Sequence, residues 1–410
     1  MRLAVISPFL DRSHGTERCV VEQLERLSRK GIQVHLYAQR VQDLRGVVRY
    51  DSRKMPADGG GIFWHKVPSI PGPHLLQFIF WYFANQFCRA RDAKRHDLKC
   101  DLVYSPGINA MDADAIAVHI VFCEFNEQVG PKLGFAGTGI GSWPRLIHRR
   151  LYYRLIMALE KRAYSNPKVS LAAVSGQVAE QLKQQFQCNN VPVIRHGVDG
   201  EIFSSQHRIA RRAASRRQFG LEDEEFVLLL IGNDWRTKGL DCLLRALGHI
   251  RETRLKLLVV GSDQRGRYQQ LVRECQLSDR VTFFPPSPDV MQFYGAADAY
   301  VGPSLEDAYG LPILEAMACG LPVIASARAG ASEIIEDGVN GVVLKDPQDD
   351  RKLAEIIRSV VTNPLHNQDV GDRASMTAQE HDWGRNAEAT GEWLKGVLAG
   401  KGGPNQGSAS

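Results

Sequence analysis

Short apolar runs alternate with helical runs in both halves of the chain, and this alternation constrains the fold more than any other feature. In the first half, Leu3–Ser7 precedes a helical pattern over Glu17–Lys30, and Val34–Tyr37 follows. In the second half, Val227–Ile231 precedes a helical pattern over Leu240–Ile250. Short strands separated by helices of this length indicate parallel sheets that are covered on both faces. The sequence therefore predicts an α/β protein with two Rossmann-like domains.

The composition fits this prediction. A chain of 410 residues is long enough for two domains with separate cores. The net charge of +5 comes without a dense basic tract, so it suits an anionic ligand or an acidic membrane surface and does not require nucleic acid. The eight cysteines form no C-x-x-C pair, which favours reduced thiols in a cytoplasmic protein over disulfides or a zinc site.

Residues 303–324, PSLEDAYGLPILEAMACGLPVI, carry the strongest functional signal. Pro312 suits the first turn of a helix and Gly320 its end. Asp307 and Glu315 therefore lie before and inside the start of this helix. Free N–H groups at a helix start suit an anionic phosphate, and carboxylates suit sugar hydroxyls. The pattern predicts a nucleotide-sugar site, although a helix of the core is the simpler alternative.

This segment resembles the E-x7-E segment of family 4 retaining glycosyltransferases of the GT-B fold, whose usual form is PSxxEGFGLPxLEAMAxGxPVIA. Strict register puts Asp307 where the family has Glu, with Glu306 beside it, so either acid is a candidate to face the sugar. The stretch HGVDGEIF at 196–203 resembles the NGVDxxxF of the family, with His196 in place of Asn. Glu333 matches the acid of GGxxEhhxdGxxG and is expected to order its loop. The resemblance covers nearly the whole chain.

The resemblance implies two Rossmann-like domains whose parallel sheets face a central cleft. It implies an acceptor-binding domain over 1–196, a donor-binding domain over 197–380 and a terminal helix over 381–398 that packs back on the first domain. The small, polar composition of the tail over 399–410 predicts disorder. The implied activity is retaining transfer of a sugar from a nucleotide diphosphate sugar, with UDP-sugars foremost. The implied acceptor is a glycan or a lipid-linked molecule in the synthesis of a cell-surface polysaccharide or lipopolysaccharide. No cofactor and no obligatory metal are implied.

The diphosphate of the donor needs cations. Lys238 follows a strand and opens a helix, so its charge and the helix N–H groups can neutralise a leaving diphosphate. Arg236 is a candidate for a second, forked contact. An exposed basic loop is the alternative for both residues. The resemblance implies that Glu315 binds the ribose and Asp307 the donor sugar. The expected donor-binding residues are Gly15, Arg236, Lys238, Glu306, Asp307, Ala308, Tyr309, Gly310, Leu311 and Glu315.

Two residues of the first half complete the expected site. Gly15 lies between the first strand and the first helix, where a glycine lets backbone approach a phosphate. His119 ends the run AIAVH and resembles the acceptor-side histidine of the family, near the transferred sugar. A turn glycine and a structural histidine are the alternatives. The candidate catalytic residues are His119, Asp307 and Lys238.

Three further interpretations remain open. Asp112 and Asp114 form a D-x-D, which binds metal in a different glycosyltransferase fold, but here a capped turn is favoured. An epimerase or a phosphorylase of the same fold is an alternative activity. A non-catalytic homologue that binds nucleotide is the other alternative.

The stretch 75–88, LLQFIFWYFANQFC, has no charge, and four basic residues follow it by position 95. It is shorter than the ~20 residues that cross a bilayer. Aromatic residues beside a basic cluster suit the interface of an anionic membrane. The alternative is a helix buried against the first sheet, with a solvated basic end. The partners expected from the sequence are thus a nucleotide sugar, a glycan or lipid-linked acceptor, and, through residues 75–95, the inner face of a membrane.

Overall fold

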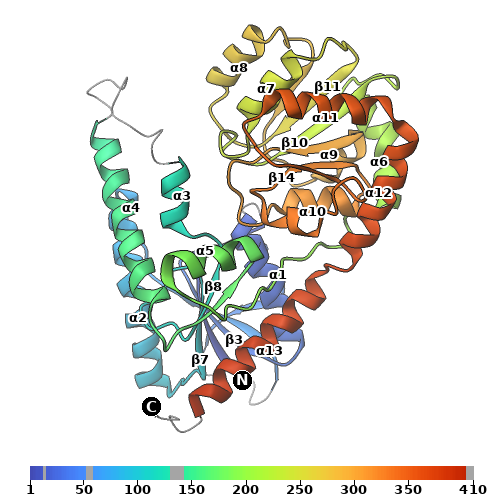
Figure 1. Ribbon diagram of the computed structural model, residues 1–410. Helices are drawn as coiled ribbons and strands as arrows, with labels where there is room; N and C mark the ends of the chain where they lie inside the picture. The colour runs from blue at the N-terminus through green and yellow to red at the C-terminus, as the bar shows by residue number, and fades with distance from the viewer. Residues whose placement is uncertain (13–14, 52–58, 130–142, 403–410) are drawn as a thin grey trace, which may run out of the picture. The chain divides into compact units, whose positions relative to one another are not determined.

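The computed structural model divides into two compact units (Figure 1). Unit 1 contains residues 1–174, 178–194 and the chain from 383 onward, and unit 2 contains residues 175–177 and 195–382. The residues that the structure describes are 1–12, 15–51, 59–129 and 143–402. Each unit is built around one parallel sheet, which confirms the fold class expected from the alternation of strands and helices.

Unit 1 has a seven-stranded parallel sheet in the order β5-β6-β3-β1-β7-β8-β9. Its strands are β1 (Arg2–Ile6), β3 (Gln33–Ala38), β5 (Val47–Arg49), β6 (Gly61–Lys66), β7 (Leu102–Pro106), β8 (Ala115–Val118) and β9 (Ser170–Ala173). A separate pair is formed by β2 (Phe9–Leu10) and β4 (Arg40–Val41). The helices are α1 (Gly15–Arg29), α2 (His74–His96), α3 (Phe122–Val129), α4 (Trp143–Tyr164), α5 (Gly176–Phe186), whose first two residues count with unit 2, and α13 (Trp383–Gly402).

The core of unit 1 is completed by the last helix of the chain. Leu24 of α1 and Leu394 of α13 belong to one buried cluster with the strands of the sheet. The amide of Gln23 donates to the side-chain oxygen of Asn386 at 3.0 Å, which adds a buried polar contact between the two helices.

The last helix extends beyond the boundary that the sequence indicated. Residues 399–402 belong to α13, and residues 403–410 lie outside the described residues. Lys401 pairs with Asp114 of unit 1 at 2.5 Å. This contact and the partly buried Val397 and Leu398 hold the helix beyond residue 398.

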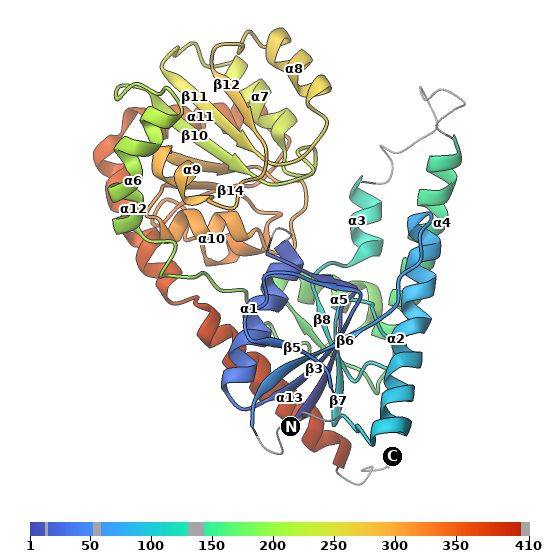
Figure 2. The same ribbon diagram turned by 180° about the vertical axis from the view of Figure 1, so that it is seen from behind.

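Unit 2 has a six-stranded parallel sheet in the order β12-β11-β10-β13-β14-β15. Its strands are β10 (Phe226–Ile231), β11 (Leu255–Val260), β12 (Val281–Phe284), β13 (Ala299–Gly302), β14 (Val323–Ser326) and β15 (Val342–Leu344). Its helices are α6 (Ser205–Gln218), α7 (Leu240–Gly248), α8 (Arg265–Glu274), α9 (Met291–Ala296), α10 (Leu311–Ala318), α11 (Asp350–Thr362), α12 (Pro364–Gln379) and the 3-10 helix Gly330–Ile334. The helices α7, α8 and α11 share one buried cluster with the sheet. On the other side, α6 packs on α9 and α10 packs on α12 (Figure 2).

The strand order of unit 2 reverses beside β10. From β10 the chain adds β11 and β12 on one side, and then crosses over to add β13, β14 and β15 on the other. Loops that leave the carboxyl ends of two such neighbouring strands run in opposite directions and open a crevice, which is where α/β proteins bind ligands. The topology therefore predicts that a ligand binds at the loops after β10 and β13.

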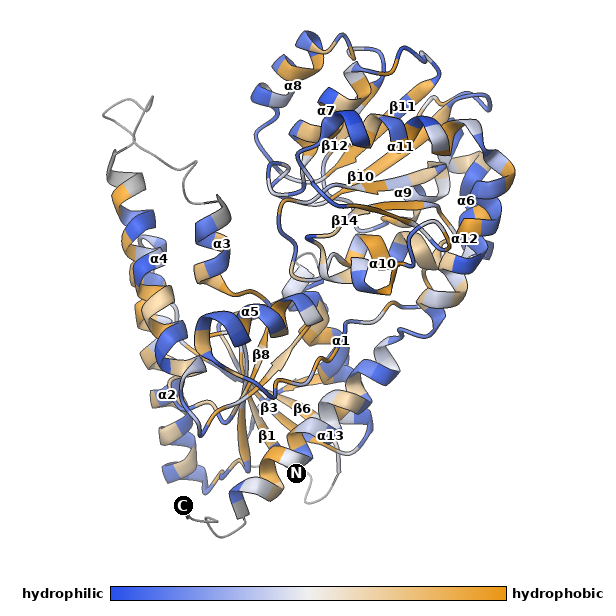
Figure 3. Cartoon of the chain, viewed as in Figure 1, coloured by the Kyte–Doolittle hydropathy of each residue, from blue (hydrophilic) through white to orange (hydrophobic). Residues whose placement is uncertain are grey.

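The helices α2 and α4 run side by side in unit 1 and mix apolar with strongly polar residues (Figure 3). Trp81 and Cys88 of α2 are buried, whereas Leu76, Phe83 and Phe87 are exposed. The stretch 75–88 is thus neither fully buried nor fully at the surface. Among the described residues, no helix combines the length and the apolar character that crossing a membrane requires.

Candidate donor site in unit 2

Three loops are joined at the carboxyl edge of the unit 2 sheet, after β10, β13 and β14. The Leu305 N–H donates to the Thr237 carbonyl at 2.8 Å, which joins the second loop to the first. The Asp307 N–H donates to the Arg328 carbonyl, and the Gly330 N–H donates to the Asp307 carbonyl, both at 3.0 Å. These bonds join the second loop to the third. The segment that the sequence assigned to the donor is therefore fixed on rigid strand ends.

The ammonium of Lys238 and the carboxylate of Asp307 form an ion pair at this edge. Their side chains are 23% and 15% exposed, so the pair is accessible but partly shielded from water. Gly239 follows with a φ of +76°, and a Cβ there would lie 1.8 Å from the Pro303 carbonyl oxygen. Glycine is required at this position because the two loops approach so closely. The structure thus brings the predicted phosphate-binding cation and the predicted sugar-binding acid together.

Two helices begin at the same edge without a side-chain cap. The N-cap residues of α7 and α10 are Gly239 and Gly310, and glycine has no side chain that could accept from the first turn. Gly310 has a φ of +88°, a conformation that favours glycine. The N–H groups of a first turn have no partner in their own helix and carry partial positive charge. Both helix starts therefore suit an anionic ligand.

The other two acids of the segment are buried, and each has its own partner. Glu306 accepts a hydrogen bond from the side-chain amide of Gln177 at 3.0 Å. Glu315 accepts one from the hydroxyl of Tyr294 at 2.7 Å and is 3% exposed. Burial, and secondarily the charge of Glu315, raise the pKa of Tyr294 well above its usual range. Of the two adjacent acids, Asp307 is therefore the one that faces the cation.

The remaining predicted donor residues differ in what they contact. The hydroxyl of Tyr309 donates to the His196 carbonyl at 2.9 Å, and the two rings meet edge to face. Leu311 is buried at the start of α10, and Ala308 is half-buried. Arg236 is half-buried, and its guanidinium makes no hydrogen bond or ion pair with any residue that the structure describes. Tyr309 therefore supports the loop, while Arg236 is available to a ligand.

Two side chains of the site were not predicted from the sequence, Gln177 and Tyr294. The backbone N–H groups of Gly176 and Gln177 donate to the Glu333 carboxylate at 3.0 and 2.7 Å, and Arg195 pairs with the same carboxylate at 3.2 Å. Gln177 lies four residues after the buried strand β9, and a polar residue so close to the end of a strand could have indicated a site residue. Tyr294 offered none, because a tyrosine in the short apolar helix MQFYGA reads as core.

Two of the predicted site residues, His119 and Gly15, belong to unit 1. His119 directly follows β8, and burial lowers its pKa to about 4. Its imidazole is therefore neutral near pH 7, which suits a hydrogen bond to a hydroxyl better than a cationic role. Gly15 opens α1, and the space where a Cβ would lie is empty, so neighbouring atoms do not require glycine there.

The acids of the D-x-D are engaged by protein groups. Arg89 donates to both oxygens of Asp112 at 2.6 and 2.8 Å. Asp114 accepts from the Val103 N–H at 2.8 Å and pairs with Lys401. Both carboxylates therefore bind groups of unit 1 that are distant in sequence, whereas the sequence favoured a capped turn.

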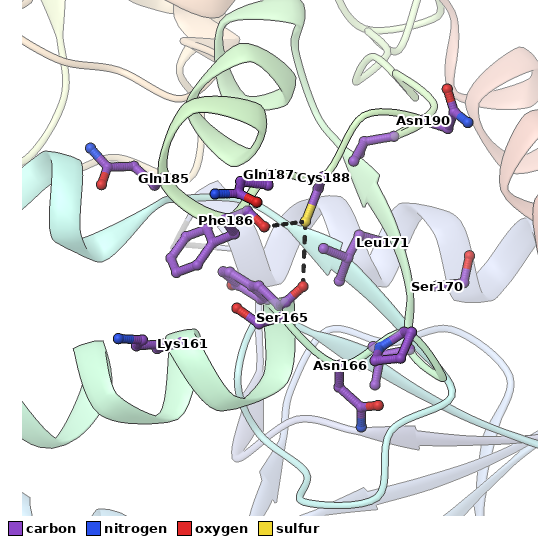
Figure 4. Close-up of a pocket in the computed structure, with 14 residues that line it drawn as sticks. Lys161, Ser165, Asn166, Ser170, Leu171, Gln185, Phe186, Gln187, Cys188 and Asn190 are labelled. Carbon is purple, nitrogen blue, oxygen red and sulfur yellow. Dashed lines mark hydrogen bonds between the residues drawn. The ribbon is translucent and has the colours of Figure 1, made fainter.

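A pocket of about 710 Å³ lies at the amino end of β9, between the ends of α4 and α5 (Figure 4). The thiol of Cys188 donates to the Tyr164 carbonyl at 3.3 Å, and Ser165, Asn166 and Gln187 lie around it. In a parallel sheet, this edge is opposite to the one from which His119 follows β8. None of the predicted site residues lines the pocket.

Two family models match the chain. Residues 13–201 match the description Glycosyltransferase Family 4, and residues 211–377 match Glycosyl transferases group 1. The D-inositol 3-phosphate glycosyltransferase of Pseudarthrobacter chlorophenolicus is 31% identical over 211 residues, which cover 49% of this chain and 49% of the relative. The lipopolysaccharide glucosyltransferase WaaG of Escherichia coli is 28% identical over 220 residues, which cover 52% of this chain and 59% of the relative. The chain thus spans about half the length of the curated relatives it matches.

Solved structures show the same fold over nearly the whole chain. The crystal structure of WaaG, a glycosyltransferase involved in lipopolysaccharide biosynthesis, has a TM-score of 0.76 and 21% identity, and covers 96% of this chain and 100% of its own. HepE of Anabaena in complex with UDP-glucose has a TM-score of 0.67 and 20% identity, and covers 97% and 100%.

The fold is therefore the GT-B fold of glycosyltransferases. The two family matches, which together cover most of the chain, show that it belongs to the family 4 glycosyltransferases.

Proposed function

We propose that the chain transfers a sugar from a nucleotide diphosphate sugar, with retention at the anomeric carbon. The observation that carries this proposal is the Lys238–Asp307 ion pair, placed between the starts of α7 and α10 at the reversal of strand order. Lys238, with Arg236 beside it, would hold the diphosphate. Asp307 and the backbone of Ala308 to Gly310 would hold the donor sugar. Catalysis would rest on positioning and on stabilising the leaving group.

The donor base and the acceptor are further parts of the proposal. HepE is crystallised with UDP-glucose, which supports a UDP-sugar donor. The names of the relatives refer to lipopolysaccharide and to an inositol phosphate, which supports a glycan or a lipid-linked acceptor in cell-surface polysaccharide or lipopolysaccharide synthesis. His119 of unit 1 would serve the acceptor side, and Gly15 would let backbone approach a phosphate of the donor.

Calorimetry across UDP-, GDP- and ADP-sugars tests the donor assignment, followed by a transfer assay with the donor that binds. Tight binding of a UDP-sugar and transfer to an added acceptor are the expected results. Turnover of the donor alone would instead indicate an epimerase, and turnover with free phosphate a phosphorylase. Binding without any turnover would indicate a homologue that only binds nucleotide.

Chelation is expected to leave transfer activity within about twofold of the untreated rate. The reason is that Lys238 and two helix starts supply positive charge where the leaving diphosphate would lie. The measurement is the initial rate with and without EDTA. Complete loss of activity that manganese or magnesium restores would contradict this expectation and make Asp112 and Asp114 candidate metal ligands again.

We also propose that unit 1 docks on the inner face of an anionic membrane through α2 and α4. The apolar stripe, defined here as Leu76, Ile79, Phe83 and Phe87, follows helical spacing along α2 and is exposed. Arg91, Lys94 and Arg95 of α2 are also exposed. Arg149, Arg150 and Arg154 add exposed charges on α4. Apolar side chains beside basic ones bind anionic lipid by burial and by attraction together.

Replacement of Phe83 and Phe87 by Ser is expected to reduce binding to anionic vesicles by at least about tenfold, because burial of each ring contributes roughly 1.5–3 kcal/mol. The measurement is sedimentation with anionic and neutral liposomes at low and high salt, where wild type should bind anionic vesicles at low salt only. The matched control is Leu365→Ser, which removes an exposed apolar side chain from α12 in unit 2. No binding of wild type to anionic vesicles at low salt would refute the docking proposal and favour a soluble acceptor.

A further inference from the structure

The start of α3 is held by a buried acid from another helix. Glu160 of α4 is 1% exposed, and its two carboxylate oxygens accept the N–H groups of Phe122 and Cys123 at 2.7 and 3.1 Å. These are the first two N–H groups of α3, which have no partner within their own helix. A residue 38 positions away in sequence thus supplies the cap of this helix.

This cap lies three residues after His119. The strand β8 pairs with β9 as far as Val118, so the residue before His119 is fixed by the sheet. Phe122 is fixed by Glu160, and its ring packs edge-on against Tyr153 of α4 at 5.3 Å. The path of the segment 119–121 is therefore set by the sheet at one end and by the cap at the other.

We propose that Glu160 is a positioning residue, which anchors the first turn of α3 and thereby fixes the backbone that carries His119. The proposal rests on the proposed function only in assigning His119 to the acceptor side. The anchoring itself does not depend on that assignment. Displacement of a positioned group by about 1 Å can lower a rate about 100-fold, so the anchor affects transfer without touching substrate.

The charge of Glu160 changes near neutral pH. Burial raises its pKa to about 7, although its two N–H hydrogen bonds act in the opposite direction. The groups that face it are Cys123 on α3, whose pKa burial raises to about 11, and Tyr164 on α4, whose pKa burial raises far above its usual range. Both stay neutral between pH 5 and 8. The other charged neighbours on the two helices are Glu124, Glu127, Lys161 and Arg162.

Docking of α3 is therefore expected to depend on pH. An acid whose pKa is higher when α3 is docked than when the acid is in water binds its proton more tightly in the docked state. Docking is thus strongest in acid and weakens as the pH rises from 4.5, the ordinary value for Glu, through about 7. This linkage predicts about a tenfold weakening between pH 6 and pH 8.

Hydrogen exchange of the α3 amides in the full chain, corrected for intrinsic rates, tests the anchor at pH 6 and pH 8. Wild-type protection is expected to fall about tenfold over this interval. Glu160→Gln should abolish the pH dependence, because the amide does not titrate but can still accept one N–H. Glu127→Gln, which changes an exposed acid on α3, should behave as wild type. A flat wild-type response, or the same response in Glu160→Gln, would overturn the proposal.

Glu160→Ala removes both hydrogen bonds and should lower α3 protection at both pH values by about 5- to 30-fold. If this variant does not fold, Glu160→Gln still decides the question. In a transfer assay, Glu160→Gln should remove the corresponding step from the pH profile of kcat/KM for the acceptor and leave the donor Kd unchanged. If wild type shows no transfer but α3 exchange still responds to pH, only the proposed function is refuted. If wild type transfers sugar but α3 exchange does not respond to pH, only the proposal that Glu160 anchors α3 is refuted.

Discussion

Replacement of Lys238 by Ala is expected to lower kcat by about 10²- to 10³-fold, the usual effect of removing one group that stabilises a developing charge. The donor Kd should change much less. The reason is that negative charge on the leaving diphosphate grows toward the transition state, so the ammonium contributes more there than in the ground state. Steady-state kinetics gives kcat, and calorimetry with the donor gives Kd.

The matched control for this variant lies on β11. Lys256 pairs with Glu225 at 3.1 Å, and the two side chains are 23% and 14% exposed, almost the same as in the Lys238–Asp307 pair. Lys256→Ala therefore removes an ion pair of similar burial in the same unit, and should leave kcat unchanged. If Lys238→Ala lowers donor affinity as much as it lowers turnover, Lys238 is a binding residue with no special role in the transition state.

The second large effect concerns the nucleotide. Glu315→Gln should weaken nucleotide binding roughly ten- to hundredfold, because a hydrogen bond to a charged group contributes about 1.5–3 kcal/mol and an amide accepts less strongly from two ribose hydroxyls. Titration calorimetry with the nucleotide diphosphate measures this directly. The thermal midpoint of the variant is measured in parallel, since Glu315 is buried and also accepts from Tyr294.

Tyr294→Phe separates the two contacts of Glu315. This variant removes the hydroxyl that bonds to Glu315 and leaves the carboxylate in place. It should therefore lower stability with little change in nucleotide affinity. Equal loss of affinity in both variants would mean that Glu315 acts through the packing of α9 on α10. Unchanged affinity in a folded Glu315→Gln protein would remove Glu315 from the donor site.

Local rules were sufficient for several elements of the fold. The helix expected over 240–250 is α7 at Leu240–Gly248, and the helix expected over 17–30 is α1 at Gly15–Arg29. Such elements are predictable because apolar periodicity, glycine and proline act within a few residues of each other. The segment 303–324 likewise contains the expected helix, with Pro312 in its first turn and Gly320 just after its end.

Local rules did not predict the contacts between distant parts of the chain. The bond from Gln177 to Glu306 joins residues 129 positions apart, and the cap from Glu160 joins residues 38 apart. Neither partner carries a mark in its local sequence that names the other. The exposed apolar stripe on α2 shows the same limit. Periodicity indicates that a helix has an apolar and a polar face, but it does not show which face packs on the sheet.

The membership of α13 in unit 1 has a consequence for the order in which the chain folds during synthesis. Unit 2 lies almost entirely within residues 195–382, so its sheet can assemble as soon as that stretch has left the ribosome. Unit 1 needs residues 383–402, the last described part of the chain, because Leu394 joins Leu24 in the same buried cluster. The part of unit 1 that precedes unit 2 in the chain is thus completed only after unit 2 has emerged. Until α13 arrives, the side of α1 that packs on α13 stays uncovered on the nascent chain.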